Sequence, residues 1–159
     1  MRTINPVTQL DAIDKAILQA LQADGRLSNQ TLAQQVHLSP SACLRRVKAL
    51  EDAGVIDKYV ALLNPRAVGQ QGSSYMIVNL ESTQPHRLQA FEEAVLQTPE
   101  ILDCVFVAGS NDYLLRFTYQ DADGLERLHR EVLTRLPGVV RTNSMLVLRT
   151  VKRTTALVL

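Results

Sequence analysis

Three cationic side chains lie within four positions of the stretch LSPSACLRRVKALEDAGVI, residues 38–56, and no acidic residue follows them until Glu51. On a helix that turns 100° per residue, one seam is apolar and consists of Cys43, Val47 and Leu50. The opposite face carries Ser41, Arg45 and Lys48. Because a major groove is about 12 Å wide and admits a helix, a face of short polar groups and guanidinium suits it. The pattern therefore indicates contact with duplex DNA.

Six residues at the start and on the polar side of this helix have a predicted part in DNA binding. Arg45 can bind a guanine edge with two hydrogen bonds, whereas Arg46 and Lys48 are better placed for phosphates. Ala42 is small enough to let a DNA backbone come close, and Ser39 caps the helix. The predicted DNA-binding residues are Ser39, Ser41, Ala42, Arg45, Arg46 and Lys48.

A charged run on a helix is more often a solvated face. Arg45 and Lys48 could form weak surface pairs with Glu51 and Asp52, which are three or four positions away. For the charges alone this alternative would be preferred. Their surroundings favour DNA, because two short capped helices, a tight VHLS turn and a β-rich segment flank the run.

The elements around this run predict a winged helix-turn-helix. Apolar spacing and capping residues indicate helices over about 11–23, from 28 to 36 and over 40–53, with Gly54 as the final stop. The aliphatic stretch VIDKYVALL, residues 55–63, predicts one or two short strands. Three helices followed by a β element form a winged domain in which the third helix reads DNA.

The second half follows a different pattern, beyond a linker rich in Gly, Gln and Ser at 64–74. The pattern predicts strands at 74–81, 101–109, 112–121 and 139–151 and helices at 85–98 and 122–136. This βαββαβ order is typical of a ferredoxin-like domain. The expected fold class is α+β, with a winged helix-turn-helix at 1–63, a hinge at 64–74 and a ferredoxin-like domain at 75–159.

The turn AGSNDY, residues 108–113, could hold a zwitterion. Its free amides can bind a carboxylate, and Asp112 can bind an ammonium group. A plain hairpin needs only such Gly and Asn residues, so turn chemistry alone favours the hairpin. On the strand 139–151, alternation places Thr142 and Ser144 on one face and Met145 on the other.

Composition and motif content argue against a membrane protein and against a metal or nucleotide site. The net charge is +1, with eight basic against six acidic residues up to Arg66 and nine against ten beyond it. Cys43 and Cys104 fall at apolar positions, and the three histidines share no metal-like spacing with them. Without a signal-like start or a long apolar run, we expect a cytoplasmic protein that does not contact membranes. No nucleotide-binding or zinc motif is present in the sequence, so no cofactor or metal is expected.

The sequence resembles the Lrp/AsnC family of leucine-responsive and asparagine-responsive regulators over essentially its whole length. The likeness is carried by LDAIDKAILQALQADGRLSNQTLAQQVHLSPSACLRRVKALEDAGVIDKYVALLNPRAVG, then AGSNDYLLRF, LPGVVRTNSMLVL and VKRTTALVL. It implies a regulatory domain that dimerises, commonly assembles into octamers and binds an amino acid near the AGSNDY turn, between dimers. The predicted effector-binding residues are Gly109, Ser110, Asn111, Asp112, Tyr113, Thr142, Ser144 and Met145.

The leading hypothesis is a sequence-specific transcription regulator of amino-acid metabolism, not an enzyme, that binds duplex DNA and a free amino acid and self-associates. An alternative is an architectural protein that wraps DNA without a ligand. A third is an enzyme or amino-acid-binding module, which lacks a second reactive group at convincing spacing beside Asp112, Cys104 and Tyr113. Which amino acid acts, which genes respond and in which direction do not follow from the sequence.

Overall fold

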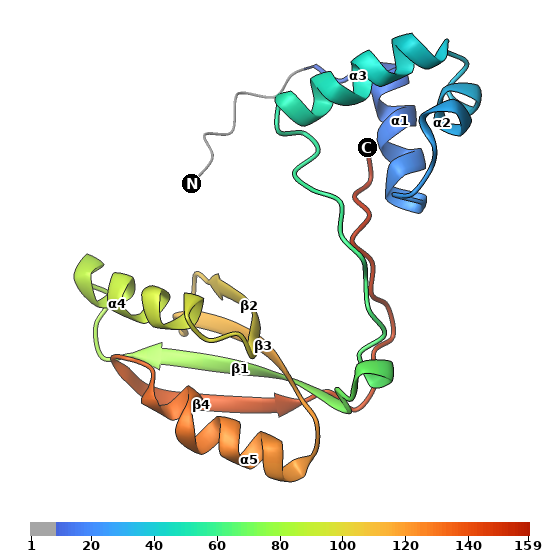
Figure 1. The fold of residues 1–159 in the computed structure, drawn as a ribbon. Helices are drawn as coiled ribbons and strands as arrows, with labels where there is room; N and C mark the ends of the chain where they lie inside the picture. Colours follow the sequence, from blue (N-terminus) through green and yellow to red (C-terminus); the bar gives the residue numbers. More distant parts are fainter. Residues whose placement is uncertain (1–8) are drawn as a thin grey trace. The chain divides into compact units, whose positions relative to one another are not determined.

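The computed structural model describes residues 9–159, which fold into two units (Figure 1). The helical unit comprises the described residues 9–62 together with the tail Lys152–Leu159, and the sheet unit comprises Leu63–Val151. The sequence placed the tail in the second domain, 75–159, whereas here it belongs to the helical unit. The chain therefore passes from one unit to the other and then returns.

Each helix of the helical unit begins after a capping side chain, as the sequence predicted. The caps and helices are Asp11 before α1 (Ala12–Ala23), Ser28 before α2 (Asn29–Gln35) and Ser39 before α3 (Pro40–Asp52). At α1 the cap is reciprocal, because Oδ1 of Asp11 accepts from the Asp14 amide and Oδ2 of Asp14 accepts from the Asp11 amide. The three helices bury one apolar cluster that includes Ile17, Leu32 and Cys43.

Left-handed residues end two of these helices. His37 follows α2 with φ 55°, and the Leu38 amide donates to the Ala33 carbonyl at 2.9 Å. Gly54 follows α3 with φ 72°, and the Val55 amide donates to the Leu50 carbonyl at 2.9 Å. Both closures are Schellman motifs, which turn the chain sharply. The predicted tight turn before α3 is thus present, although a histidine occupies the position that usually favours glycine.

The prediction of one or two strands over 55–63 is wrong for this structure. Residues 57–64 belong to no strand, and the helical unit has no sheet within the described residues. A strand needs a hydrogen-bonded neighbour, and in the described part of this chain the ladders of the single sheet join only β1–β4. Exposed apolar side chains remain along the segment, among them Val60 and Leu62.

The sheet unit has the predicted βαββαβ order. Its elements are β1 (Gly72–Leu80), α4 (Pro85–Leu96), β2 (Ile101–Phe106), β3 (Tyr113–Tyr119), α5 (Ala122–Glu131) and β4 (Val139–Leu146), with single 3-10 turns η1 (Arg66–Val68) and η2 (Leu133–Arg135). All strand pairs are antiparallel, in the order β2-β3-β1-β4. The predicted linker 64–74 contains η1 and the start of β1, and β4 ends five residues earlier than expected.

Both helices cover the same face of the sheet. Met76 and Val78 of β1 alternate into one buried cluster with Phe91 of α4 and Leu128 of α5. The side chains between them point to the other, open face, where Tyr75 lies opposite Met145 in the register and both are exposed. The ferredoxin-like fold class is confirmed, with one covered and one open sheet face.

The tail is attached to the helical unit by a side-chain amide. Nε2 of Gln22, near the end of α1, donates to the Leu157 carbonyl at 3.1 Å, and Oε1 of Gln22 accepts from the Leu157 amide. One glutamine therefore satisfies both backbone groups of one tail residue, as a neighbouring strand would.

Candidate nucleic-acid interface and ligand site

Helix α3 is oriented by its buried side. Cys43 and Leu50 are buried in the core of the helical unit, and Val47 packs against the same cluster. Ser39 accepts a hydrogen bond from the Ala42 amide at 3.3 Å, and Pro40 occupies the first turn. The predicted stripe of Ser41, Arg45 and Lys48 is consequently exposed along the outer side of the helix.

Arg45 and Lys48 are available to an external anion. Within residues 9–159, neither has a carboxylate oxygen within 4.0 Å. Glu51, one of the surface partners that the alternative interpretation required, instead accepts a hydrogen bond from the Tyr59 hydroxyl at 3.1 Å. Partial desolvation of the Tyr59 ring, and then this bond, raise the pKa of its phenol.

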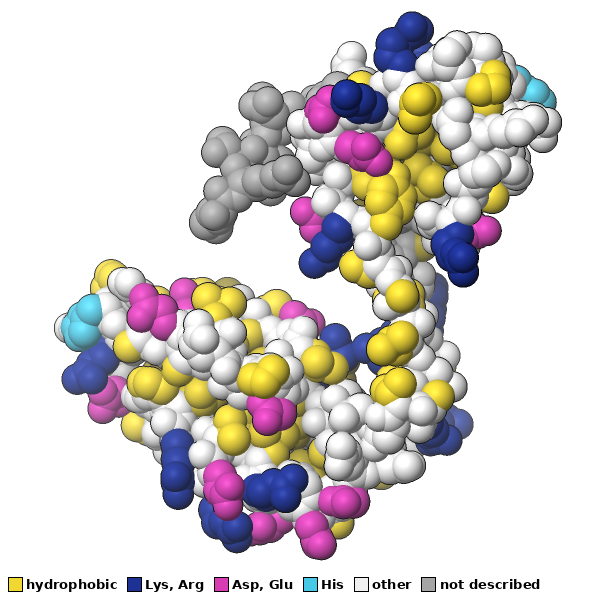
Figure 2. Space-filling view, in the orientation of Figure 1, with side chains coloured by type: hydrophobic (Ala, Val, Ile, Leu, Met, Phe, Trp, Pro, Cys, Tyr) yellow, Lys and Arg dark blue, Asp and Glu magenta, His cyan; other side chains and the backbone are white. Residues whose placement is uncertain are grey.

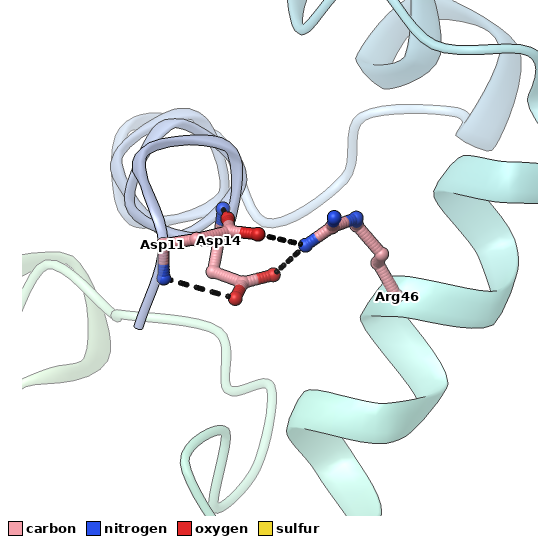
Figure 3. A network of polar contacts seen from close by, with 3 residues as sticks. All are labelled: Asp11, Asp14 and Arg46. Carbon is pink, nitrogen blue, oxygen red and sulfur yellow. Dashed lines mark hydrogen bonds and ion pairs between the residues drawn. The ribbon is translucent and has the colours of Figure 1, made fainter. Parts of the chain in front are cut away.

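Arg46 contacts two carboxylates of the helical unit, as Figure 3 shows, whereas Arg45 contacts none in the described chain. Nη1 of Arg46 lies 2.7 Å from Oδ2 of Asp11 and 2.8 Å from Oδ1 of Asp14, so it joins α3 to the start of α1. These bonds raise the pKa of the guanidinium, and the pKa of Asp11 falls, chiefly through the Asp14 amide and then through Arg46. The phosphate contact predicted for Arg46 does not agree with this geometry, since the side chain is already engaged by two carboxylates.

The three small predicted residues, Ser39, Ser41 and Ala42, lie at the start of α3. The Ser39 hydroxyl is used as the cap and lies 3.3 Å from the Ser41 hydroxyl, while Ala42 is half-buried. Leu44 was not among the predicted site residues, yet its side chain is 58% exposed on this helix. A helical wheel would have shown it, because Leu44 comes three positions after Ser41 and four before Lys48.

Charge elsewhere on the molecule is mixed. On the face shown in Figure 2, basic and acidic side chains are interspersed over both units. This agrees with the net charge of +1. Attraction to a polyanion must therefore arise from local groups, of which the α3 stripe is one.

The turn between β2 and β3 is fastened to the end of β1. Gly109 has φ 138°, Nδ2 of Asn79 donates to the Ser110 carbonyl at 3.0 Å, and Oδ2 of Asp112 accepts from the Leu80 amide at 2.7 Å. Gly109 and Ser110 are exposed, and Asn111 is half-buried. Asp112 thus has a structural partner for one oxygen, which the sequence did not reveal.

Tyr113 faces the core rather than the turn. Its ring is 1% exposed and packs 4.5 Å, centroid to centroid, from Phe91, and its hydroxyl donates to Oε1 of Glu92 at 2.7 Å. Burial, followed by this bond, raises the pKa of the phenol. The structure therefore does not bring the Tyr113 side chain to the predicted ligand site, although its backbone adjoins it.

The β4 residues of the predicted site are divided between two faces. Thr142 pairs with Val78 and Ser144 with Met76, which places both on the helix-covered face. Met145 pairs with Tyr75 on the open face and is 41% exposed. Ser144 also lines a cavity of about 400 Å³ beneath α5, together with Leu125, Glu126, His129 and Leu146 among others.

Other reactive groups give no site within residues 9–159. Cys43 and Cys104 are unbonded thiols, and burial raises the pKa of both, that of Cys104 to about 11. The described residues hold no group of three potential metal ligands. None of the described helices is both long enough and apolar enough to cross a bilayer.

Two family models match the chain, one in each half. A winged helix-turn-helix DNA-binding model matches residues 10–57, and an Lrp/AsnC ligand binding domain model matches residues 73–157. The leucine-responsive regulatory protein of Escherichia coli K12 is 40% identical over 154 residues, which cover 97% of this chain and 94% of that protein.

Two solved structures extend the similarity to ligand complexes. A Neisseria meningitidis transcriptional regulator in complex with L-Met has a TM-score of 0.89 and 38% identity, covering 94% of this chain and 96% of that one. A feast or famine regulatory protein of M. tuberculosis, complexed with L-methionine, has a TM-score of 0.83 and 32% identity, covering 92% and 97%.

Proposed function

Because this chain belongs to the Lrp/AsnC family of DNA-binding transcriptional regulators with an amino-acid-binding domain, we propose that α3 enters the major groove of an operator and that an amino acid modulates its affinity. The observation that carries the proposal is the exposed stripe of Ser41, Arg45 and Lys48, whose cations have no carboxylate partner in the described chain. Arg46 has a different role, since it positions α3 against α1.

The two free cations have separate tasks. The planar guanidinium of Arg45 recognises a guanine edge through two hydrogen bonds, which gives sequence preference. Lys48 neutralises a phosphate, which gives affinity for any duplex and sensitivity to salt.

Substitution of these cations tests the DNA-binding proposal. Arg45→Ala weakens binding to a selected operator by roughly 5- to 150-fold but affects random duplex less, because it removes a contact worth about 1–3 kcal/mol. Lys48→Ala weakens binding to both duplexes and reduces the slope of log K against log salt by about one. Arg135→Ala, which removes an exposed cation of the sheet unit, is the control. Equal loss on every sequence for Arg45→Ala would contradict base recognition.

The ligand site that we propose is the turn Gly109–Asp112. The amides of Gly109, Ser110 and Asn111 bind the carboxylate of an amino acid, because the Asp112 amide already donates to the Val78 carbonyl at 3.1 Å. Oδ1 of Asp112, the oxygen not bonded to the Leu80 amide, binds the ammonium group. Two structurally similar regulators were solved with methionine, so methionine and leucine are the first ligands to test. Thr142, Ser144 and Met145 lie on two faces of one sheet, so a ligand that contacts all three needs groups from a second copy of the chain.

Asp112→Asn distinguishes the ligand-binding role of this side chain from its structural role. The amide oxygen of asparagine can still accept from the Leu80 amide, whereas the charge that attracts an ammonium group is lost. We expect roughly ten- to hundredfold weaker amino-acid binding by calorimetry, with little change in melting temperature. Asp103→Asn on β2 is the matched control. Absence of heat and of a melting shift with all twenty amino acids would favour the ligand-independent architectural role.

The open face of the sheet supports self-association. It exposes apolar side chains that include Tyr75, Val105 and Met145. We propose that two copies pack through this face and that dimers assemble further, up to an octamer. A twofold dimer presents two α3 helices to half-sites about one DNA turn apart, so the operator is palindromic. Val105→Glu should yield monomers in analytical ultracentrifugation, whereas Leu96→Glu on α4 should not.

A further inference from the structure

Leu44 is an apolar side chain along one edge of the proposed DNA-contacting stripe. It is 58% exposed, and its neighbours on the same side of α3 are Ser41, three positions before it, and Lys48, four positions after it. Among the large apolar side chains of α3, which lies wholly within the described residues, it alone has this degree of exposure.

Packing within the helical unit does not explain why an apolar side chain occupies position 44. The apolar seam of α3 consists of Cys43, Val47 and Leu50, and Leu44 belongs neither to that buried cluster nor to the partly buried residues around it. Burial of the Leu44 side chain against an apolar group of a binding partner would therefore lower the free energy relative to its exposure to water.

The chemistry of the groove identifies that apolar group. Side chains near the start of a recognition helix contact base edges, and Leu44 is the fifth residue of α3. The edges of the bases in the major groove carry hydrogen-bond donors and acceptors, with one apolar feature, the 5-methyl group of thymine. We propose that Leu44 packs against a thymine methyl in each half-site, next to the guanine that Arg45 contacts. This inference rests on the proposed function, because it requires α3 to lie in the groove.

Removal of single methyl groups from the DNA tests the contact. A duplex is first selected from a random pool with the full chain, and each thymine is then replaced in turn by deoxyuridine, which lacks only the 5-methyl group. Replacement of the contacted thymine in one half-site should weaken wild-type binding by about fourfold, the ratio expected for one buried methyl-sized group, and replacement in both half-sites by about 15-fold. Leu44→Ala should bind the unmodified duplex with a similar loss and should not respond to uridine at that position.

Two controls distinguish a contact at the methyl group from a general effect of losing an exposed leucine. Leu96→Ala removes such a leucine from the sheet unit and should respond to uridine as the wild type does. Because Leu44 is exposed, Leu44→Ala should keep the wild-type melting temperature and sedimentation behaviour.

Three results overturn the inference: no single uridine weakens wild-type binding, Leu44→Ala retains the wild-type response at every position, or Leu44→Ala changes the oligomeric state. Failure of the wild-type chain to bind any duplex at low salt would instead refute the proposed function. The two failures are therefore distinguishable.

Discussion

The two candidate sites of this chain are built in different ways. The proposed DNA-contacting stripe lies on one helix, and its direction is set by the buried seam of that same helix. The proposed ligand site combines a turn with the edge strand β4, and its β4 residues lie on both faces of the sheet. A site on one helix therefore depends on the local periodicity of the sequence, whereas a site that spans several strands depends on strand register and on neighbouring copies of the chain.

Removal of a large core side chain should have the greatest effect on stability. It should also show whether the two units unfold independently. Phe117→Ala in the sheet unit should lower the free energy of unfolding by about 3–5 kcal/mol, and Ile17→Ala in the helical unit by about 2–5 kcal/mol. Hydrogen exchange followed by mass spectrometry should show faster exchange mainly in the altered unit. Uniform acceleration over both units would mean that they do not unfold separately.

Tyr113→Phe tests whether the Tyr113 hydroxyl is structural. The substitution removes the bond to Glu92 but retains the ring, so we expect a loss of about 0.5–1.5 kcal/mol in stability. Amino-acid affinity measured by calorimetry should remain unchanged, because the side chain faces the helices. A strong loss of amino-acid affinity at unchanged stability would mean that the Tyr113 hydroxyl contributes to ligand binding.

His37→Gly should stabilise the helical unit by up to about 1 kcal/mol. His37 has φ 55°, a conformation that glycine adopts without the steric cost that a side chain imposes. Thermal unfolding would measure the gain. The reciprocal change, Gly54→Ala at φ 72°, should destabilise the same unit, and equal melting temperatures for both variants would contradict a steric cost at these positions.

Acid should weaken the Asp11–Arg46 contact, the smallest of these effects because both groups are partly exposed to solvent. The pKa of Asp11 lies below 3.8 in the folded chain, so the charged form stabilises folding above about pH 3.8, and this contribution is lost as the pH falls through the folded value. Asp11→Asn retains the capping oxygen but not the charge. Its melting temperature should therefore fall less steeply than that of the wild type below pH 3.8.

The local features of the fold could be predicted from the sequence. Asp11, Ser28 and Ser39 mark helix starts through contacts with residues three positions away, and each is confirmed as a cap. The βαββαβ order followed from the change of apolar period. The inward position of Tyr113 could also have been predicted, because alternation places it on the same face as Leu115 and Phe117.

Features that join distant segments could not be predicted in this way. Arg46 and Arg45 are adjacent in sequence, yet only Arg46 meets Asp11, which is 35 positions away. The bond from Asp112 to the Leu80 amide depends likewise on the register of β1 and β3. The segment 55–63 has the composition of a strand but no partner in the described chain, and composition alone cannot supply one.

The return of the tail to the helical unit makes that unit discontinuous along the chain. A fragment cut after Leu62 would lack Leu157 and would leave the Gln22 amide to water, whereas a fragment over 63–151 would contain the whole sheet unit. A fluorescent label placed on the tail would accordingly report on the unit that carries α3, even though the tail follows β4 of the sheet unit in sequence.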